Sequence, residues 1–502
     1  MAGTRTHVLA IDQGTTGSTA LVLDPDARVV GRGYTEFAQH YPRPGWVEHD
    51  PDDIWRSVLD VAGAALADAG LRPADVAAVG ITNQRETVVL WDRRTGDPVA
   101  PAVVWQDRRT AGACDELRAR GLEALVRRRT GLVIDAYFSG TKVAWLLDHV
   151  DGLRARAEAG EIAFGTVDSW LLHRLTGGRV HVTDPTNASR TMLFDIGRLA
   201  WDDELLAELR VPRAVLPTVV PSLGVAAETD PAAFLGITAP VGGVLGDQQA
   251  ALLAQACTEP GSAKNTYGTG SFVLMNTGSA AVLDHTSMLT TVALSTAEST
   301  SYALEGPMFV TGSAVQWLRD ELGVITAASD TEALARSVPD TGDVWFVPAL
   351  AGLGAPYWDP YARGLLLGIT RGTGRAQLVR AVLESIAYLT RDVTDAMQHD
   401  SGQRLEELRV DGGAAANRWL MQFQADVLGV PVDVPFQLES TSLGSGLLAG
   451  IAAGIWPGLD AIARARTTAA RYEPQMGTDE REARFARWHR VVDRARDWAD
   501  DR

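Results

Sequence analysis

The chain has 502 residues, of which 46% are hydrophobic and 22% charged, and its formal net charge is −17. This length exceeds what a single hydrophobic core supports, so it predicts two large domains in a folded globular protein. The net negative charge argues against nucleic acid as a partner, because such binding depends on cationic contacts with phosphates.

The composition also predicts a cytoplasmic protein. The only apolar run near the N-terminus, residues 8–11, is too short for the core of a signal peptide. The longest later apolar stretch, residues 447–456, contains glycines and is shorter than the roughly 20 residues that a membrane span needs. Two cysteines, Cys114 and Cys257, are too few for a disulfide framework. We therefore expect no membrane span.

The first segment alternates in the manner of β-strands at residues 7–12, 19–24 and 28–37. Asp12 ends the first strand, and the Gln-Gly-Thr-Thr sequence that follows it predicts a turn whose backbone N–H groups could approach a phosphate closely. Asp12 is placed to hold Mg²⁺ beside such a phosphate, through water. Gly-Thr pairs also close ordinary hairpins, and that alternative stays open for a single copy.

A helix is predicted to begin after Asp50, with Pro51 at its first position, and to end at Gly70. A buried strand at residues 76–81 then ends in a polar turn, residues 82–87, which contains Arg85 and Glu86. Two adjacent charges at the mouth of a buried strand are costly unless both have partners. The alternative is an ordinary solvated turn.

Residues 241–245 read as another buried strand, which continues through Gly246 into Asp247 and a small-residue helix at 250–256. An acid at a strand-to-helix junction lies where α/β proteins place ligands, although Asp247 could instead be an ordinary N-cap. Only two lysines occur, Lys142 and Lys264, and both lie in segments that resemble motifs. The presence of lysine rather than arginine at these two positions favours a role for a compact cation there, with chance as the alternative.

A second Gly-Thr turn occurs at residues 266–270, half a chain away from the first. Two such turns facing each other could hold one nucleotide between two halves of the molecule. Later strands are expected at 344–348, 365–369 and 408–411, and a long helix at 376–399. Residues 411–413 predict a further turn that approaches the nucleoside, with Asn417 at the start of a helix. The last helix, from residue 478, is expected to dock through Phe485, Trp488, Val492 and Ala495.

Taken together, these segments resemble the FGGY carbohydrate kinases, and most of all the members that phosphorylate glycerol. The matching stretches are residues 12–16, 41–50, 81–87, 137–142, 246–249, 263–272, 352–364 and 411–417. The resemblance implies an α/β fold of two actin-like, ribonuclease-H-like domains with an active-site cleft between them. The first domain, residues 1–255, would carry the glycerol site and the first phosphate turn. The second, residues 256–502, would bind the nucleotide and end in the docked helix.

By this resemblance the activity is phosphorylation of glycerol by ATP with Mg²⁺, and Asp247 is the catalytic base. The glycerol site falls on Arg85, Glu86, Trp105, Tyr137, Asp247, Gln248 and Phe272. The nucleotide contacts fall on Thr15, Thr16, Gly17, Thr269, Gly312, Gln316, Gly413 and Asn417, and the metal on Asp12 and Asp247. The resemblance also implies a homo-oligomer, a dimer or a tetramer.

One position departs from the family pattern, because Thr19 stands where the family usually has an arginine that reaches toward the phosphates. We expect weakened phosphoryl transfer or compensation by another group, such as Lys264. Three alternatives remain: an FGGY kinase for another polyol or a ketose, an actin-like or chaperone-like ATPase, and a non-catalytic relative. The sequence Gln84-Arg85-Glu86 favours glycerol, since family members that act on sugars usually carry a different turn there.

Overall fold

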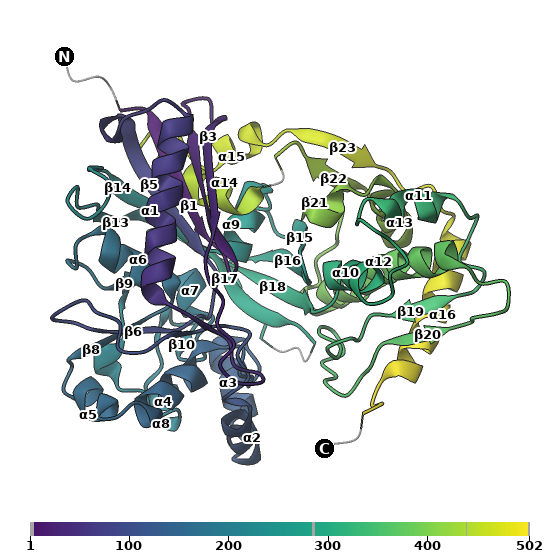
Figure 1. Cartoon of the computed structure of the whole chain (residues 1–502), viewed down its shortest axis with the longest axis horizontal. Helices are drawn as coiled ribbons and strands as arrows, with labels where there is room; N and C mark the ends of the chain where they lie inside the picture. Colours follow the sequence, from purple (N-terminus) through teal and green to yellow (C-terminus); the bar gives the residue numbers. More distant parts are fainter. Residues whose placement is uncertain (1–4, 284–286, 438, 500–502) are drawn as a thin grey trace.

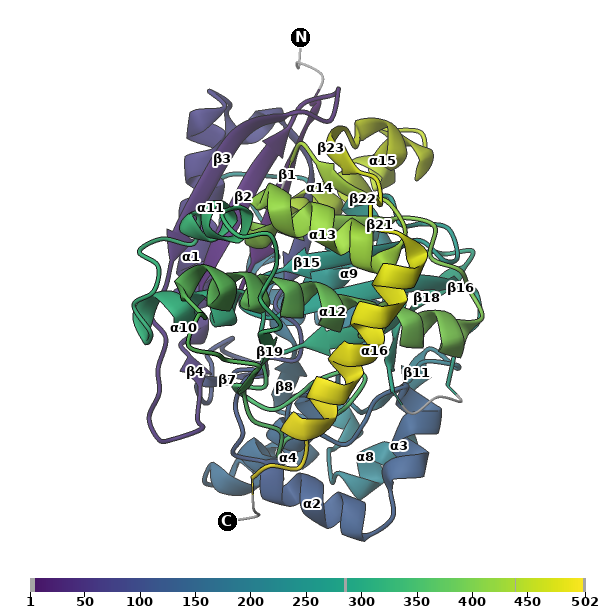
Figure 2. The same ribbon diagram turned by 90° about the vertical axis from the view of Figure 1, so that its right-hand side faces the viewer.

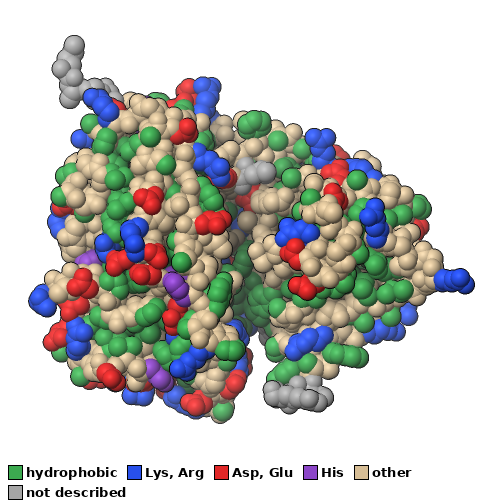
Figure 3. Space-filling model, in the orientation of Figure 1, with side chains coloured by type: hydrophobic (Ala, Val, Ile, Leu, Met, Phe, Trp, Pro, Cys, Tyr) green, Lys and Arg blue, Asp and Glu red, His purple; other side chains and the backbone are tan. Residues whose placement is uncertain are grey.

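The computed structural model describes residues 5–283, 287–437 and 439–499. The chain forms two lobes, each built around a large mixed β-sheet flanked by helices (Figure 1). Figure 3 shows that a deep groove separates the lobes on this face of the molecule. The two-domain α/β architecture expected from the sequence is thereby confirmed.

The sheet of the first lobe contains the strands expected near the N-terminus. Their spatial order is β13 (Leu223–Glu228), β14 (Pro240–Gly246), β5 (Val76–Asn83), β1 (His7–Gln13), β2 (Gly17–Leu23) and β3 (Val29–Glu36). Strand β1 is antiparallel to β2 and parallel to β5, and β5 is parallel to β14. Because the central strands are parallel and are covered on both faces, their side chains are almost all buried.

Helix α1 (Pro51–Asp68) covers one face of this sheet. It begins as predicted, with the Asp50 side chain accepting the backbone N–H of Asp52 and with Pro51 at the first position. Its apolar side chains recur at helical spacing and are buried, as Ile54 and Val58 illustrate. The predicted helix and its core-facing side are therefore confirmed.

The sheet of the second lobe has the order β17 (Leu289–Ser295), β18 (Thr300–Met308), β16 (Ser271–Gly278), β15 (Ala263–Tyr267), β21 (Leu408–Gly412), β22 (Val432–Pro435) and β23 (Thr468–Tyr472). The strand expected at 408–411 is β21, which runs parallel to β15. The strands expected at 344–348 and 365–369 form a separate pair, β19 (Trp345–Val347) and β20 (Leu365–Leu367). Strands β17 and β18 were not predicted.

Two helices connect the lobes. Helix α9 (Asp247–Ala254) follows the last strand of the first sheet and packs against β15, β16 and β17 of the second. Helix α14 (Ser440–Ala452) comes from the second half of the chain and packs against β1, β5 and β14 of the first sheet. The two helices touch so closely that a Cβ on Gly444 would lie 2.0 Å from the carbonyl oxygen of Ala250. Only glycine fits at this crossing.

The second lobe is completed by α12 (Arg375–Ser401), α13 (Arg418–Leu428) and α16 (Thr478–Ala495). Figure 2 shows α16 lying diagonally across the outside of this lobe. The predicted docking side chains Phe485, Trp488, Val492 and Ala495 are buried, and the Trp488 ring stacks on Tyr388 at a centroid distance of 5.4 Å. The expectation of a docked C-terminal helix is confirmed.

The remaining elements surround these two cores. The helices are α2 (Ala111–Ala119), α3 (Glu123–Thr130), α4 (Ser139–His149), α5 (Leu153–Glu158), α6 (Val167–Leu175), α7 (Pro185–Ala188), α8 (Asp203–Glu208), α10 (Gly312–Asp320), α11 (Asp330–Arg336) and α15 (Asp460–Ala465). Short strand pairs are β4 (Glu48–His49) with β7 (Ala102–Val103), β6 (Val89–Asp92) with β8 (Ile162–Gly165), β9 (Val182–Thr183) with β12 (Thr218–Val219), and β10 (Phe194–Asp195) with β11 (Ala200–Trp201). In the part of the chain that the structure describes, no helix has the length and apolarity to cross a membrane.

Candidate active site

Three parallel strands of the first sheet end at the same edge. In the register of the sheet, Asp12 of β1 and Leu245 of β14 both lie beside Thr82 of β5. The shared direction of the strands brings the turn after β5 and the start of α9 to one place, the carboxyl edge where α/β folds hold ligands. Arg85 and Asp247 consequently form an ion pair, with Arg85 Nε 3.0 Å from Asp247 Oδ1.

Arg85 and Glu86 are buried, at 2% and 1% exposure, so the alternative of a solvated turn is wrong. Glu86 has a backbone φ of 63°, an uncommon conformation for a residue with a side chain. Such strain persists where the surrounding contacts fix the residue, and it concentrates at functional sites. Both charges are therefore held in place rather than left to solvent.

Asp247 is the first residue of α9, and the N-cap position belongs to Gly246. The alternative in which Asp247 is an ordinary N-cap is thus not realised. Its Oδ1 accepts the backbone N–H of Gln248 at 2.7 Å, and its side chain is 30% exposed. A carboxylate that is fixed by a buried arginine and still partly accessible can accept a proton from a bound hydroxyl.

Two further side chains, Arg190 and Glu305, complete the charged cluster under this site, and the sequence analysis missed both. Arg190 Nε donates to Glu86 Oε1 at 2.6 Å, and Arg190 also donates to Glu305 Oε1 at 2.8 Å. Burial acts to raise the pKa of Glu305, but Arg190 and Arg85 outweigh it and lower that pKa to about 2. Glu305 therefore stays ionised. No short motif could have revealed these residues, because Arg190 meets Glu86 across 104 positions of the chain and Glu305 meets Arg85 across 220 positions.

The predicted apolar walls of the glycerol site come from separate elements. The rings of Trp105 and Tyr137 meet edge to face at a centroid distance of 5.6 Å. Phe272 lies on β16 and is partly buried against an apolar cluster that includes Leu252 of α9. Trp105 Nε1 also donates to Thr15 Oγ1 at 2.8 Å, so one predicted wall is bonded directly to the first Gly-Thr turn.

The two lysines have different roles. Lys142 Nζ donates to three main-chain carbonyls, those of Ala136, Tyr137 and Phe138, and so fixes the loop that carries Tyr137. Lys264 Nζ donates to Gln248 Oε1 at 2.5 Å and to Thr266 Oγ1 at 2.8 Å. Burial lowers the pKa of Lys264 to about 8, although Asp411 and Asp247 partly offset this effect.

Both Gly-Thr segments form tight turns between antiparallel strands. In the first, the N–H of Gly14 donates to the carbonyl of Gly17 at 2.9 Å, leaving Thr16 exposed at the tip. In the second, the N–H of Gly268 donates to Gly270 at 2.8 Å, and Thr269 is exposed. The second turn packs on the start of α10, because the N–H of Gly312 donates to the carbonyl of Gly268 at 3.1 Å.

The other predicted nucleotide residues lie near this second turn. Strand β21 ends at Gly412, which pairs with Tyr267 and adopts a φ of 84°; a Cβ there would lie 2.3 Å from the Tyr267 carbonyl. Gly413 follows and is exposed, and Gln316 is exposed on α10. Asn417 caps α13 through its side-chain oxygen and donates its amide to Thr331 Oγ1 at 3.1 Å. Its side chain thus has structural partners of its own.

Asp12 and Asp247 together fit a weakly coordinated divalent cation. The Oδ1 atom of Asp12 is buried and has no hydrogen-bond partner. Burial and the neighbouring Asp247 and Glu439 raise the pKa of Asp12 to about 8. Among the described residues no group of three or more His, Cys, Asp or Glu side chains could hold a metal by itself. Mg²⁺ commonly needs only one or two carboxylates when substrate phosphates supply the other ligands.

Comparison with known proteins shows the family of this chain. Models of the N-terminal and C-terminal domains of the FGGY family of carbohydrate kinases match residues 7–254 and 263–453. The chain belongs to the FGGY family of carbohydrate kinases. Its similarity extends over almost the whole length of curated relatives. It is 56% identical to the glycerol kinase of Carboxydothermus hydrogenoformans over 99% of both chains, and 57% identical to glycerol kinase 2 of Thermotoga maritima over 98% of this chain and 99% of that one.

Solved structures of FGGY kinases share the fold. The glycerol kinase of Plasmodium falciparum, crystallised with ADP, superposes with a TM-score of 0.91 at 33% identity, covering 97% of this chain and 98% of that one. A xylulose kinase from Rhodospirillum rubrum gives a TM-score of 0.85 at 25% identity over the same shares. The architecture is therefore common to kinases with different acceptors, and the choice of acceptor must come from individual side chains.

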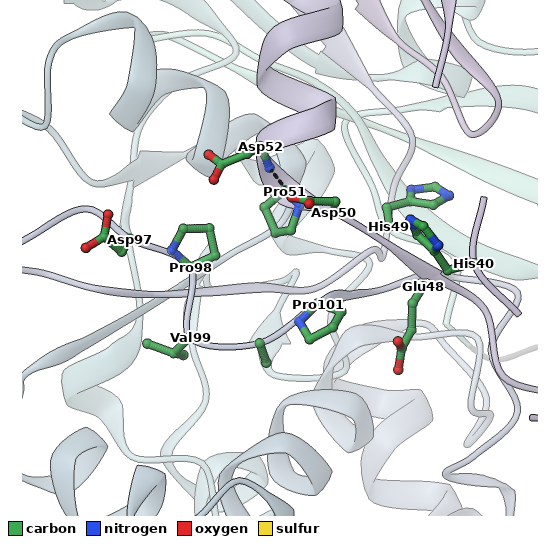
Figure 4. Close-up of a pocket in the computed structure, with 11 residues that line it drawn as sticks. His40, Glu48, His49, Asp50, Pro51, Asp52, Asp97, Pro98, Val99 and Pro101 are labelled. Atoms are coloured by element: carbon green, nitrogen blue, oxygen red, sulfur yellow. Dashed lines mark hydrogen bonds between the residues drawn. The ribbon is translucent and has the colours of Figure 1, made fainter. Parts of the chain in front are cut away.

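A surface hollow of about 600 Å³ lies outside this site, in the first lobe of the FGGY kinase (Figure 4). It is lined by the end of β4, the start of α1 and the loop before β7, with His40, Asp50 and Pro101 among the side chains drawn. Its lining, within the described residues, includes no predicted site residue. The candidate active site is instead the edge of the first sheet at the groove between the lobes.

Proposed function

We propose that this FGGY kinase transfers the γ-phosphoryl group of ATP to glycerol, giving sn-glycerol 3-phosphate and ADP, the first step of glycerol catabolism. The observation that carries the proposal is the buried Arg85–Glu86 pair beside the partly exposed carboxylate of Asp247. The relatives named as glycerol kinases, at 56% and 57% identity over nearly the full length, support the same acceptor.

Glycerol must be recognised by hydrogen bonds, because three carbon atoms offer little apolar area. Arg85 supplies donors, and Glu86 and Asp247 supply acceptors within one small region. Since Lys264 donates to Gln248 Oε1, the amide nitrogen of Gln248 is the end left to donate to a hydroxyl. Trp105, Tyr137 and Phe272 would cover the carbon backbone. This set of partners matches a short triol.

Asp247 would act as the base that accepts the proton of the attacking hydroxyl. Phosphoryl transfer passes through a loose transition state, so the protein contributes mainly by holding acceptor and donor in line. Arg85 fixes the Asp247 carboxylate through the 3.0 Å ion pair, and this reduces the number of orientations that the base can adopt. General-base assistance of this kind contributes on the order of 10²–10⁴ in rate.

Mg²⁺ would be held by Asp12 and Asp247, whose carboxylates fit it as described above. When bound with ATP, Mg²⁺ neutralises charge that develops on the phosphates. The backbone N–H groups of the turns at Thr15, Thr16 and Gly17 and at Thr269 would bind the phosphates. Gly312, Gln316, Gly413 and Asn417 would contact the rest of the nucleotide.

We further propose a cytoplasmic enzyme that forms a homo-oligomer, with its domains divided at residues 255 and 256. Helix α14 then comes from the second domain but packs on the sheet of the first. ATP and ADP are the nucleotide partners in this proposal, and no nucleic acid takes part.

A coupled assay of ADP release tests the function. Purified protein with ATP and Mg²⁺ is expected to release ADP only when glycerol is added, with one glycerol 3-phosphate formed per ADP. A panel of other polyols and ketoses, including xylulose, provides the comparison. Faster turnover with a ketose would favour the alternative FGGY activity, and ATP hydrolysis without any acceptor would favour an actin-like ATPase.

A further inference from the structure

Glu305, a carboxylate on the second lobe, has no role in the reaction proposed above. Glu305 lies on β18, directly opposite Leu274 of β16, and Leu274 in turn lies opposite Lys264 of β15. Side chains directly opposite each other project from the same face of a sheet. Leu274 belongs to the same buried apolar cluster as Leu252 of α9, so this face is the one turned toward the first lobe.

Glu305 binds two arginines that both come from the first lobe. Its Oε2 accepts from Arg85 at 2.6 Å, and its Oε1 accepts from Arg85 at 3.1 Å and from Arg190 at 2.8 Å. The pairing with Arg85 is bidentate, which fixes the plane of the guanidinium as well as its position. Glu305 has 0% exposure, so water cannot replace these bonds.

The bidentate pairing with Glu305 fixes the direction in which Nε of Arg85 points. With its two terminal nitrogens on Glu305, Arg85 presents Nε to Asp247 at 3.0 Å and lies 3.9 Å from Glu86. Arg190 Nε donates to Oε1 of the same Glu86 at 2.6 Å. Without Glu305, the terminal nitrogens of Arg85 would keep the 3.3 Å bond from Nη1 to Gln249 Oε1 but could otherwise turn onto Glu86 or Asp247. Those two carboxylates are the acceptors that a polyol needs.

We propose that Glu305 is a positioning residue for the acceptor: it holds Arg85 from the opposite lobe, so that the glycerol site is complete only when the two lobes are packed together. This inference rests on the proposed function and deepens it. Arg190 takes part in the same positioning, because it links the Glu305 carboxylate to Glu86. The acceptor site of the first lobe thus depends on a residue that lies more than 200 positions later in the chain.

A purely structural role is the competing explanation, since loss of one partner of any buried ion pair destabilises a protein. The chain offers a matched control. Glu384 is 4% exposed on α12 and accepts from Arg380 Nε at 3.0 Å, in the second lobe and outside the site. Glu384→Gln removes the charge of a buried Glu–Arg pair in the same way as Glu305→Gln.

The experiment measures kcat, KM for glycerol, KM for ATP and Tm for the wild type, Glu305→Gln, Glu305→Asp and Glu384→Gln. We expect Glu305→Gln to raise KM for glycerol at least tenfold with KM for ATP within twofold of wild type. Glu305→Asp, which keeps the charge, should recover part of the loss. Glu384→Gln should lower Tm without changing KM for glycerol. Equal changes in both KM values, or an unchanged KM for glycerol in Glu305→Gln and Glu305→Asp, would overturn the proposal.

Two further measurements distinguish a failure of this inference from a failure of the proposed function. If the wild type phosphorylates another acceptor in the panel faster than glycerol, the proposed function is wrong, and the same KM comparison is made with that acceptor. Crystal structures of Glu305→Asp and Glu305→Gln give a readout that needs no turnover. Displacement of the Arg85 guanidinium from Asp247 in Glu305→Gln is the expected result, and an Arg85 that keeps its wild-type position overturns the proposal. If Glu305→Gln does not fold, Glu305→Asp decides both measurements.

Discussion

Asp247 is the residue on which the proposed chemistry depends most. Asp247→Asn keeps the size of the side chain but removes the group that would accept the hydroxyl proton. We expect kcat to fall on the order of 10²–10⁴-fold while ATP affinity, measured by calorimetric titration, stays within a few-fold of wild type. A kcat near the wild-type value would remove Asp247 from the role of base.

Thr19, which stands where the family usually has an arginine, leads to a second prediction about catalysis. In the register of β1 and β2, Thr19 lies directly opposite Asp12, so an arginine at position 19 would reach the metal and phosphate region. Thr19→Arg is therefore expected to raise kcat/KM for ATP severalfold, and Thr19→Gln, which adds length without charge, should not. An unchanged or lower kcat/KM in Thr19→Arg would show that no cation is missing from the site.

Among individual residues, those in short motifs at the ends of strands could be predicted from the sequence as site residues. Arg85 and Asp247 each follow a buried strand, and the parallel register brings them together. Glu305 and Arg190 could not be predicted, because they contact the site only through packing between segments far apart in the chain. Thr15 was predicted as a phosphate contact, but its hydrogen bond with Trp105 was also invisible before folding.

At the scale of elements, strand β4 supports the first Gly-Thr turn through a buried histidine. His49 contacts Gln39 Oε1 at 2.7 Å and Gln84 Nε2 at 3.4 Å, and Gln84 donates to Gly14 of the turn at 3.2 Å. Burial, with a smaller contribution from His40, lowers the pKa of His49 to about 4. The ring is therefore neutral in the folded protein at physiological pH, where it can both donate and accept.

This pKa predicts a pH dependence of stability. Between pH 6.5 and about 4 the unfolded chain protonates His49 and the folded protein does not, so the free energy of unfolding falls as the pH falls. Across two pKa units the loss is about 2–3 kcal/mol. Denaturant titrations of wild type and His49→Gln at pH 7 and 4.5 should show a smaller loss in the variant, with His149→Gln at an exposed position as the control. An equal loss in wild type and His49→Gln would contradict the assignment.

Helices and strands whose apolar residues recur at a regular spacing were predicted well. Strands that contain buried polar groups were not. Helix α1 combined a capping residue with regular apolar spacing, and β1 and β5 were short apolar runs ending in polar turns. Strand β18 has Glu305, Gly306 and Pro307 in consecutive positions, a pattern that does not indicate a central strand. It lies inside the sheet because the first lobe supplies the partners of its buried carboxylate.

At the scale of the whole molecule, the proposed site belongs to neither lobe alone. Asp12, Arg85 and Asp247 come from the first lobe, whereas Lys264 and Glu305 come from the second. Helices α9 and α14 pack against each other and connect the two lobes. A change in the angle between the lobes would therefore alter the acceptor site directly, and domain closure around a substrate is a common way for an enzyme to complete its catalytic site.

The most direct test of the account is a crystal structure of the protein with glycerol and ADP bound. We predict that glycerol lies at the carboxyl edge of the first sheet, with one terminal hydroxyl within hydrogen-bonding distance of Asp247 and others on Arg85 and Glu86. The ADP phosphates should lie between the turns at Thr16 and Thr269. Glycerol bound elsewhere, or a nucleotide that contacts neither turn, would contradict the account.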